Sequence, residues 1–212
     1  MKDESLLAEY ILPSGSSRYS GLMPSLDDLL TRAGLVPQEL GGLAVAVGPG
    51  SFTGIRVGLS MIKGLSESLA IPLVGVSTLE AMASQVSHVN YDICPLVASR
   101  KGEVFTALFR WSKRGELLRV KEDTCVRITD IVTILETTTV FIGNNFAQQG
   151  HALIEQFGTD TLCAPANLWT LRASSIGILG FRRLRNGDSH NSSELVPTYV
   201  READIRPPTK KL

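Results

Sequence analysis

The chain has 212 residues, of which 43% are hydrophobic and 20% charged, so it is long enough to bury the core of one or two globular domains. Its 21 basic and 21 acidic side chains balance, which gives no electrostatic basis for binding nucleic acid or a membrane surface unaided. No apolar run has the length needed to span a bilayer, and we expect no secretory signal in the acidic opening MKDESLLAEYIL. Three cysteines without a CxxC pair favour reduced thiols, so we expect a cytoplasmic protein.

The first elements indicate an α/β chain. Leu6–Leu12 alternates weakly and predicts a strand, and leucines at helical spacing predict a helix over Ser20–Ala33. The apolar run Leu43–Val47 predicts a strand that enters a glycine-rich turn. A long amphipathic helix over Ser51–Ala70 follows and ends before Pro72.

The later elements continue the alternation, and a change of pattern near Val89 marks a boundary between two lobes, residues 1–88 and 89–212. Ser77 and Glu80 have the spacing of a capping box. The tail Val196–Leu212 contains three prolines and is expected to be extended. Strands are predicted at Val74–Val76, Ile93–Ala98, Glu103–Trp111, Leu117–Val126 and Val140–Ile142, and helices at Thr78–Val86, Asp130–Glu136, Gln148–Phe157 and Ala173–Leu184.

The glycine-rich turn has the wrong spacing for the well-known phosphate loops. A Walker A loop needs Lys followed by Ser or Thr after its closing glycine, but Ile55 and Arg56 follow Gly54. The dinucleotide-binding fingerprint needs a glycine where Thr53 stands. We therefore predict a structural glycine turn, with Ser51 or Thr53 capping the next helix. This turn consists of Gly48, Pro49, Gly50 and Ser51.

The long helix carries two glycines one turn apart. Glycine inside a helix costs roughly 1 kcal/mol relative to alanine, so two on one face indicate close approach by another element. Two alternatives stay open: a partner helix approaches this face, or a strand of the same chain does. An adjoining face of the helix is also apolar. One sheet does not cover two apolar faces, so this pattern favours a partner helix. We define the glycine stripe as Gly54, Gly58, Met61 and Leu65.

Few residues of the sequence suit a catalytic or metal-binding role. His88, His151 and His190 are widely separated, so no HxxxH pair presents two imidazoles to a metal from one helix. A Ser-His-acid site is not excluded by spacing, yet no GxSxG elbow is present, and Ser51 suits helix capping better. We predict no catalytic residue, no metal site and no cofactor of the chain's own.

The segment GPGSFTGIRVGLSMIKGLSESLAIPLVGVSTLEAMA resembles the signature of the TsaB family, also called YeaZ-like proteins. ASRKGEVFTALF resembles the basic hairpin of that family, although Ala98 replaces its usual acid, and LVPTYVR resembles its closing motif. These matches cover nearly the whole chain. The resemblance implies an actin-like, sugar-kinase-like (ASKHA) α/β fold of two lobes. It also implies a non-catalytic scaffold in the modification of adenosine beside the tRNA anticodon to threonylcarbamoyladenosine.

The resemblance further implies a partner surface. In the family, the first two helices pack against a paralogous transferase, TsaD, which carries the HxxxH motif. Carried over by position, the contact joins the glycine stripe to Met23, Leu26 and Leu30. A TsaE-like ATPase would recognise the pair, tRNA would bind only through the complex, and a homodimer would form without the paralogue. Whether a nucleotide binds at the subunit junction stays open. The alternatives are an actin-like ATPase or phosphotransferase and, less favoured, a peptidase.

One departure concerns the first strands. Family members begin with a strand ending in Asp-Thr-Ser and a second strand before the segment that LLAEYIL matches, and nothing here corresponds to them. The expected amino-terminal lobe therefore lacks its first strands, which would leave an unpaired edge in the middle of its sheet. We expect Met1 to be an internal methionine or the chain to be truncated; otherwise the sheet is completed in another way.

Overall fold

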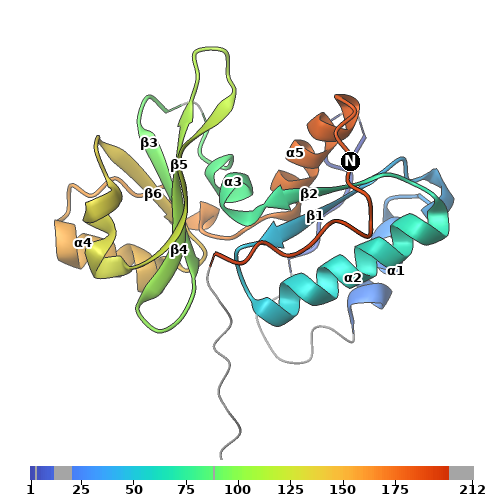
Figure 1. The fold of residues 1–212 in the computed structure, drawn as a ribbon, viewed down its shortest axis with the longest axis horizontal. Coiled ribbons are helices and arrows are strands. Elements are labelled where there is room, and N and C mark those ends of the chain that lie inside the picture. Colours follow the sequence, from blue (N-terminus) through green and yellow to red (C-terminus); the bar gives the residue numbers. More distant parts are fainter. Residues whose placement is uncertain (3, 12–20, 88, 201–212) are drawn as a thin grey trace, which may run out of the picture.

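Two β-sheets with helices on their faces lie side by side (Figure 1). The structure is a computed structural model that describes residues 1–2, 4–11, 21–87 and 89–200. The first sheet contains β1 (Leu43–Gly48) and β2 (Leu73–Ser77), which run parallel with Leu43 opposite Leu73. The connection between them is α2 (Phe52–Leu69), the crossover helix that a parallel pair requires.

The first sheet is buried on both faces, because α2 covers one and α5 (Ala173–Arg185) covers the other (Figure 1). Side chains of a strand alternate between its faces. Val45 accordingly packs with Leu59 of α2, whereas an added Cβ at Gly180 of α5 would lie 2.3 Å from the Ala44 Cβ. The run LAVAVG is apolar at nearly every position for this reason.

The second sheet has the strand order β5-β4-β3-β6, with β3 parallel to β6 and the other pairs antiparallel. One face packs against α3 (Thr78–Ala83), which also contacts both strands of the first sheet. The opposite face is covered by the 3-10 helix η2 (Ile128–Ile134) and by α4 (His151–Phe157). The strands are β3 (Asp92–Ala98), β4 (Glu103–Trp111), β5 (Leu117–Arg127) and β6 (Thr139–Gly143).

Most predicted elements are present. The predicted helix at Ser20–Ala33 is α1 (Leu22–Arg32), although Ser20 lies outside the described residues. The Ser51 hydroxyl caps α2 by accepting the Gly54 N–H at 3.3 Å, and Ser77 caps α3 in the same way. The remaining elements are three short turns of helix: η1 (Pro37–Glu39), the π-helical η3 (Phe146–Gly150) and η4 (Ala166–Leu168).

The predicted strand at Leu6–Leu12 is wrong over its described part. Residues 6–11 form no strand, and Leu12 is not described. In the described part of the chain no strand pairs with this segment. Its apolar side chains are largely exposed, namely Leu6, Leu7, Tyr10 and Ile11. The Glu9 carboxylate instead holds this segment on α5, accepting the Ser174 N–H at 2.7 Å.

Three predicted helices have different bounds or types. The helix expected at Thr78–Val86 ends at Ala83, and the Ser84 hydroxyl donates back to the Ala81 carbonyl at 2.7 Å. The segment at Asp130–Glu136 is the 3-10 helix η2, in which the Thr133 hydroxyl donates to the Asp130 carbonyl. The segment at Gln148–Phe157 starts within η3 and becomes α-helical only at His151.

The division into residues 1–88 and 89–212 stays a prediction. The strands of the two sheets fall on either side of it, but α5 returns to pack against β1 and β2. Residues 196–200 form neither helix nor strand, and the rest of the predicted extended tail lies outside the described residues.

Two buried carboxylates fix chain segments that are far apart in the sequence. The Glu9 side chain is 5% exposed and pairs with Arg172 at 2.6 Å. Burial opposes its ionisation, but the Ser174 N–H and the Arg172 guanidinium outweigh burial and hold the Glu9 pKa below its ordinary value. Asp92, 1% exposed, accepts from Arg110 at 2.5 Å and from the Thr137 hydroxyl at 2.7 Å, which lower its pKa in spite of burial.

The stability of the fold should fall in acid because of these two groups. With lowered pKa values, both bind fewer protons in the folded than in the unfolded chain around pH 4, so their stabilisation is complete above about pH 5. It is lost as the pH falls through the folded pKa values. Urea unfolding at several pH values should show this slope, and Glu9→Gln/Asp92→Asn should reduce it. An equal slope in the double variant would contradict the assignment.

Candidate partner-binding surface

The glycine turn joins β1 to α2 and packs under the carboxy-terminal segment. Gly48 has a φ of 113°, and a Cβ added there would lie 2.9 Å from the Thr198 carbonyl oxygen, so only glycine fits without strain. The Thr198 N–H donates to the Val47 carbonyl at 2.8 Å and fixes this crossing. The turn is therefore held by backbone contacts from residues about 150 positions away along the chain.

The two glycines of the glycine stripe line a groove of about 300 Å³, which we call the α2 groove. Thr78 of α3 and Asn144 after β6 lie on its other side, so it lies between the two sheets. A Cβ added at Gly58 would stand 3.9 Å from Val45 Cγ2, an ordinary contact with its own strand. Met61 and Leu65 are half-buried further along α2. Gly58 thus shows the approach of a strand of the same chain, one of the two alternatives.

The α1 residues of the predicted surface lie in different surroundings. Leu26 and Leu30 line a cavity of about 760 Å³, whereas Met23 is 51% exposed. We call it the α1–α5 cavity, because its walls also include Gly177 and Phe181 of α5. The structure therefore places Gly54 and Gly58 at one hollow and Leu26 and Leu30 at another, while Met23, Met61 and Leu65 line neither. The partner surface stays a prediction at the level of single residues.

Sequence reasoning missed an exposed aromatic cluster at the start of α2. The Arg56 guanidinium lies 3.9 Å from the centroid of the Phe52 ring, and its Nε donates to the Tyr199 hydroxyl at 2.8 Å. Phe52 and Tyr199 are about half exposed. Arg and aromatic side chains of this kind dominate many protein interfaces. The signal was Tyr199 in LVPTYVR, but Arg56 lies 143 positions away, so the pair was not apparent.

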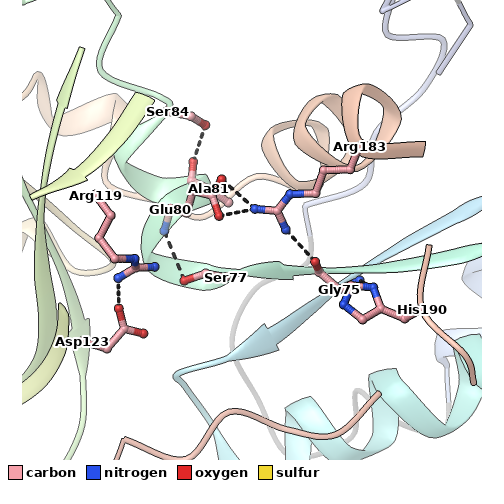
Figure 2. Close-up of polar contacts among 9 residues, drawn as sticks. All are labelled: Gly75, Ser77, Glu80, Ala81, Ser84, Arg119, Asp123, Arg183 and His190. Carbon is pink, nitrogen blue, oxygen red and sulfur yellow. Dashed lines mark hydrogen bonds and ion pairs between the residues drawn. The ribbon is translucent and has the colours of Figure 1, made fainter. Parts of the chain in front are cut away.

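A second missed group joins the helices of the two sheets (Figure 2). Arg183 of α5 binds both carboxylate oxygens of Glu80 on α3, at 2.6 and 2.8 Å, and donates to the Gly75 carbonyl of β2 at 2.7 Å. The Gly75 N–H donates to His190 Nδ1 at 3.3 Å. Ser77 and Glu80 were predicted as a capping box. The Glu80 N–H donates to Ser77 Oγ as predicted, but the Glu80 carboxylate binds Arg183.

The described residues offer little for chemistry. Over residues 1–2, 4–11, 21–87 and 89–200, no three His, Cys, Asp or Glu side chains are grouped as a metal site requires. Burial raises the pKa of the Cys94 thiol to about 12, so it stays protonated and unreactive. None of the helices in the described part is long and apolar enough to cross a membrane.

Comparison with known proteins decides the family. The family model described as "TsaD: tRNA N6-adenosine threonylcarbamoyltransferase" matches residues 11–205. The tRNA threonylcarbamoyladenosine biosynthesis protein TsaB of Bacillus subtilis (strain 168) is 31% identical over 207 residues, which cover 96% of this chain and 88% of that protein. The chain belongs to the TsaB family. The TsaB protein of Haemophilus influenzae is 25% identical over 85% of this chain and 78% of its own length.

Solved structures show the same fold. A Pseudomonas aeruginosa protein, titled as uncharacterized with similarity to peptidase YEAZ, superimposes with a TM-score of 0.68 at 20% identity. The match covers 86% of this chain and 83% of that one. The expected actin-like two-lobe α/β fold is confirmed by these neighbours and by the family model. In the described part of the chain, β1 and β2 form a two-stranded sheet.

Proposed function

We propose that this TsaB-family chain is a non-catalytic scaffold for threonylcarbamoylation of adenosine in tRNA. Its partner would be a paralogous TsaD-like transferase that carries the HxxxH pair. The observation that carries the proposal is the likeness to a TsaB protein over 96% of the chain, in a sequence with three isolated histidines. The equal numbers of basic and acidic side chains support tRNA binding by the assembled complex rather than by this chain alone.

The features around α2 support a protein contact on the first lobe. Met23 on α1 and the Phe52–Arg56–Tyr199 cluster leave large apolar and aromatic surface exposed. Such surface commonly marks an interaction site. Gly54 and Gly58 of the glycine stripe line the α2 groove, where the absence of a side chain leaves the backbone open to a close neighbour. We place the TsaD-like partner on α1 and α2, with a TsaE-like ATPase binding the pair. Without its partner the chain would form a homodimer through the same surface.

Co-expression with the paralogue from the same organism tests this function. Size-exclusion chromatography with light scattering should show a one-to-one complex, and Gly54→Leu/Gly58→Leu should weaken it by about 100-fold or more, because two leucines prevent close approach. The matched control is Gly64→Leu on the same helix, where an added Cβ meets no atom within 4 Å. That variant should keep the complex.

The outcomes separate the parts of the proposal. A complex that survives the double substitution would support the scaffold role but show that the contact lies away from the glycine stripe. Failure of the folded wild-type chain to associate with the paralogue would refute the scaffold role. Circular dichroism of each variant confirms that the comparison is made between folded proteins.

A further inference from the structure

The edge of β2 that faces away from β1 is closed by residues from later in the chain (Figure 2). The His190 N–H donates to the Leu73 carbonyl at 2.8 Å, and the Gly75 N–H donates to His190 Nδ1 at 3.3 Å. Arg183 donates to the Gly75 carbonyl at 2.7 Å. The His190 imidazole therefore gives Gly75 the acceptor that a neighbouring strand would otherwise provide.

The segment that begins at this histidine crosses the first lobe beside α2, and we call residues 190–199 the α2 strap (Figure 1). The Ser192 hydroxyl donates to the Glu67 carboxylate in the last turn of α2. At the other end of the strap, the Tyr199 hydroxyl accepts from Arg56 in the second turn of the same helix. The α2 strap thus runs antiparallel to α2 and contacts it near both of its ends.

Leu195 anchors the middle of the α2 strap. Its side chain is 5% exposed and packs between α2 and the strands in the core of the first lobe. A Cβ added at Gly75 would lie 2.7 Å from Leu195 Cδ1, so the leucine lies directly over the residue that His190 binds. The imidazole and the buried leucine therefore depend on the same position of β2, and a change at one reaches the other.

The hydrogen bond from Gly75 to His190 requires an unprotonated Nδ1. A protonated imidazole has two N–H donors and no acceptor, so it would turn a donor toward the Gly75 N–H. Histidine is the side chain whose charge ordinarily changes between pH 5 and 8. The contact is therefore compatible with the neutral imidazole and incompatible with the charged one.

The elements around His190 contribute charges of both signs. Glu67 of α2 borders the same hollow of about 310 Å³, and Arg183 of α5 binds the same glycine. β2 has no ionisable side chain in its sequence LVGVS. Asp188 and Glu194, before and after the histidine in the chain, are exposed, so solvent weakens their effect. Because Glu67 and Arg183 act in opposite directions on a charged imidazole, the N–H that faces Nδ1 decides against the protonated form.

We propose that His190 is a pH-dependent anchor of the α2 strap. The neutral imidazole holds the strap on β2, and its protonation in mild acid loosens the strap from Gly75 onward. Leu195 then loses part of its support, and Tyr199 holds Arg56 less firmly at the start of α2. This inference does not rest on the proposed function, because no partner of the chain enters it.

Nuclear magnetic resonance of the full chain tests the proposal. At pH 7.5 the ring nitrogen shifts of His190 should show an unprotonated Nδ1 and a protonated Nε2. Exchange of the Gly75 amide, corrected for its intrinsic pH dependence, should be about tenfold faster at pH 5.5, where roughly a tenth of an ordinary histidine remains neutral. The Thr198 amide, which donates to the Val47 carbonyl at 2.8 Å, should follow by a smaller factor.

Substitutions separate this anchor from other effects of acid. His190→Asn keeps an acceptor oxygen without a titrating group, so protection of the Gly75 amide should no longer depend on pH. His190→Phe removes the acceptor and should leave this amide in fast exchange at both pH values. Position 190 is exposed, so both variants should fold. The matched control is His151→Asn on α4, where the histidine contacts Phe146, and it should keep the pH dependence of the wild type.

Three results would overturn the proposal. The first is protection of the Gly75 amide that does not change between pH 7.5 and pH 5.5. The second is an equal change in His190→Asn, which would assign the pH dependence to another group. The third is a change at Gly75 without any at Thr198, which would confine the effect to one hydrogen bond and leave the α2 strap in place.

Discussion

Replacing Gly180 with alanine is expected to lower the free energy of unfolding by about 2–3 kcal/mol, the usual cost of overpacking a core. The new methyl group would lie 2.3 Å from the Ala44 Cβ and 3.2 Å from Val74 Cγ1. The Ala44 Cβ is fixed to the backbone and cannot rotate away, so α5 must move off the first sheet. This loss outweighs the gain of roughly 1 kcal/mol that alanine brings to a helix interior.

Gly177→Ala is the matched control on the same helix. Its added Cβ would lie 2.7 Å from Met1 Sδ, the flexible end of a side chain that can shift. This variant should therefore be neutral or more stable by up to about 1 kcal/mol. Measured by thermal unfolding, the Tm of Gly180→Ala should lie about 5–10 °C below that of the wild type. The Tm of Gly177→Ala should be unchanged or higher. Equal behaviour of the two variants would contradict the packing of α5 on β1.

Replacing Arg183 with methionine should also cost about 2–3 kcal/mol of stability. Methionine keeps the apolar stem. It leaves the Glu80 carboxylate, 19% exposed, without the guanidinium nitrogen that contacts both its oxygens, and the Gly75 carbonyl without its donor (Figure 2). We place the loss below that of a fully buried pair, because the Arg183 side chain is 32% exposed. The same change should loosen α3, which lies between the two sheets.

The neighbouring Arg182 provides the comparison. It pairs with Glu4 at 2.9 Å, but both side chains are largely open to solvent, 53% and 38% exposed. Arg182→Met should therefore cost less than about 1 kcal/mol. Urea unfolding of both variants, together with Glu80→Gln and the Arg183→Met/Glu80→Gln double variant, gives the coupling energy of the pair. A coupling energy near zero would show that Arg183 stabilises the fold through packing alone.

Much of the candidate site was accessible to local reasoning. The glycine turn, the Ser51 cap and the limits of α2 follow from neighbouring residues, since a cap and its N–H lie within one turn. The residues predicted on α1 and α2 were harder to place together. Periodicity assigns Leu26 and Gly58 to faces of their own helices, but it does not say which hollow each face borders. The exposed cluster of Phe52, Arg56 and Tyr199 depended on where the carboxy-terminal segment crosses α2.

The sequence by itself determined the α/β class, the strand–turn–helix at β1 and α2, and the family, because these depend on patterns within short stretches. Only the tertiary structure decided that residues 6–11 form no strand and that Arg183 joins Glu80 across 103 positions. It also placed an apolar cavity between α1 and α5 beside β1. A strand exists only when another strand accepts its hydrogen bonds, and a salt bridge only when two distant segments meet. Both conditions are set by long-range packing, which local patterns do not specify.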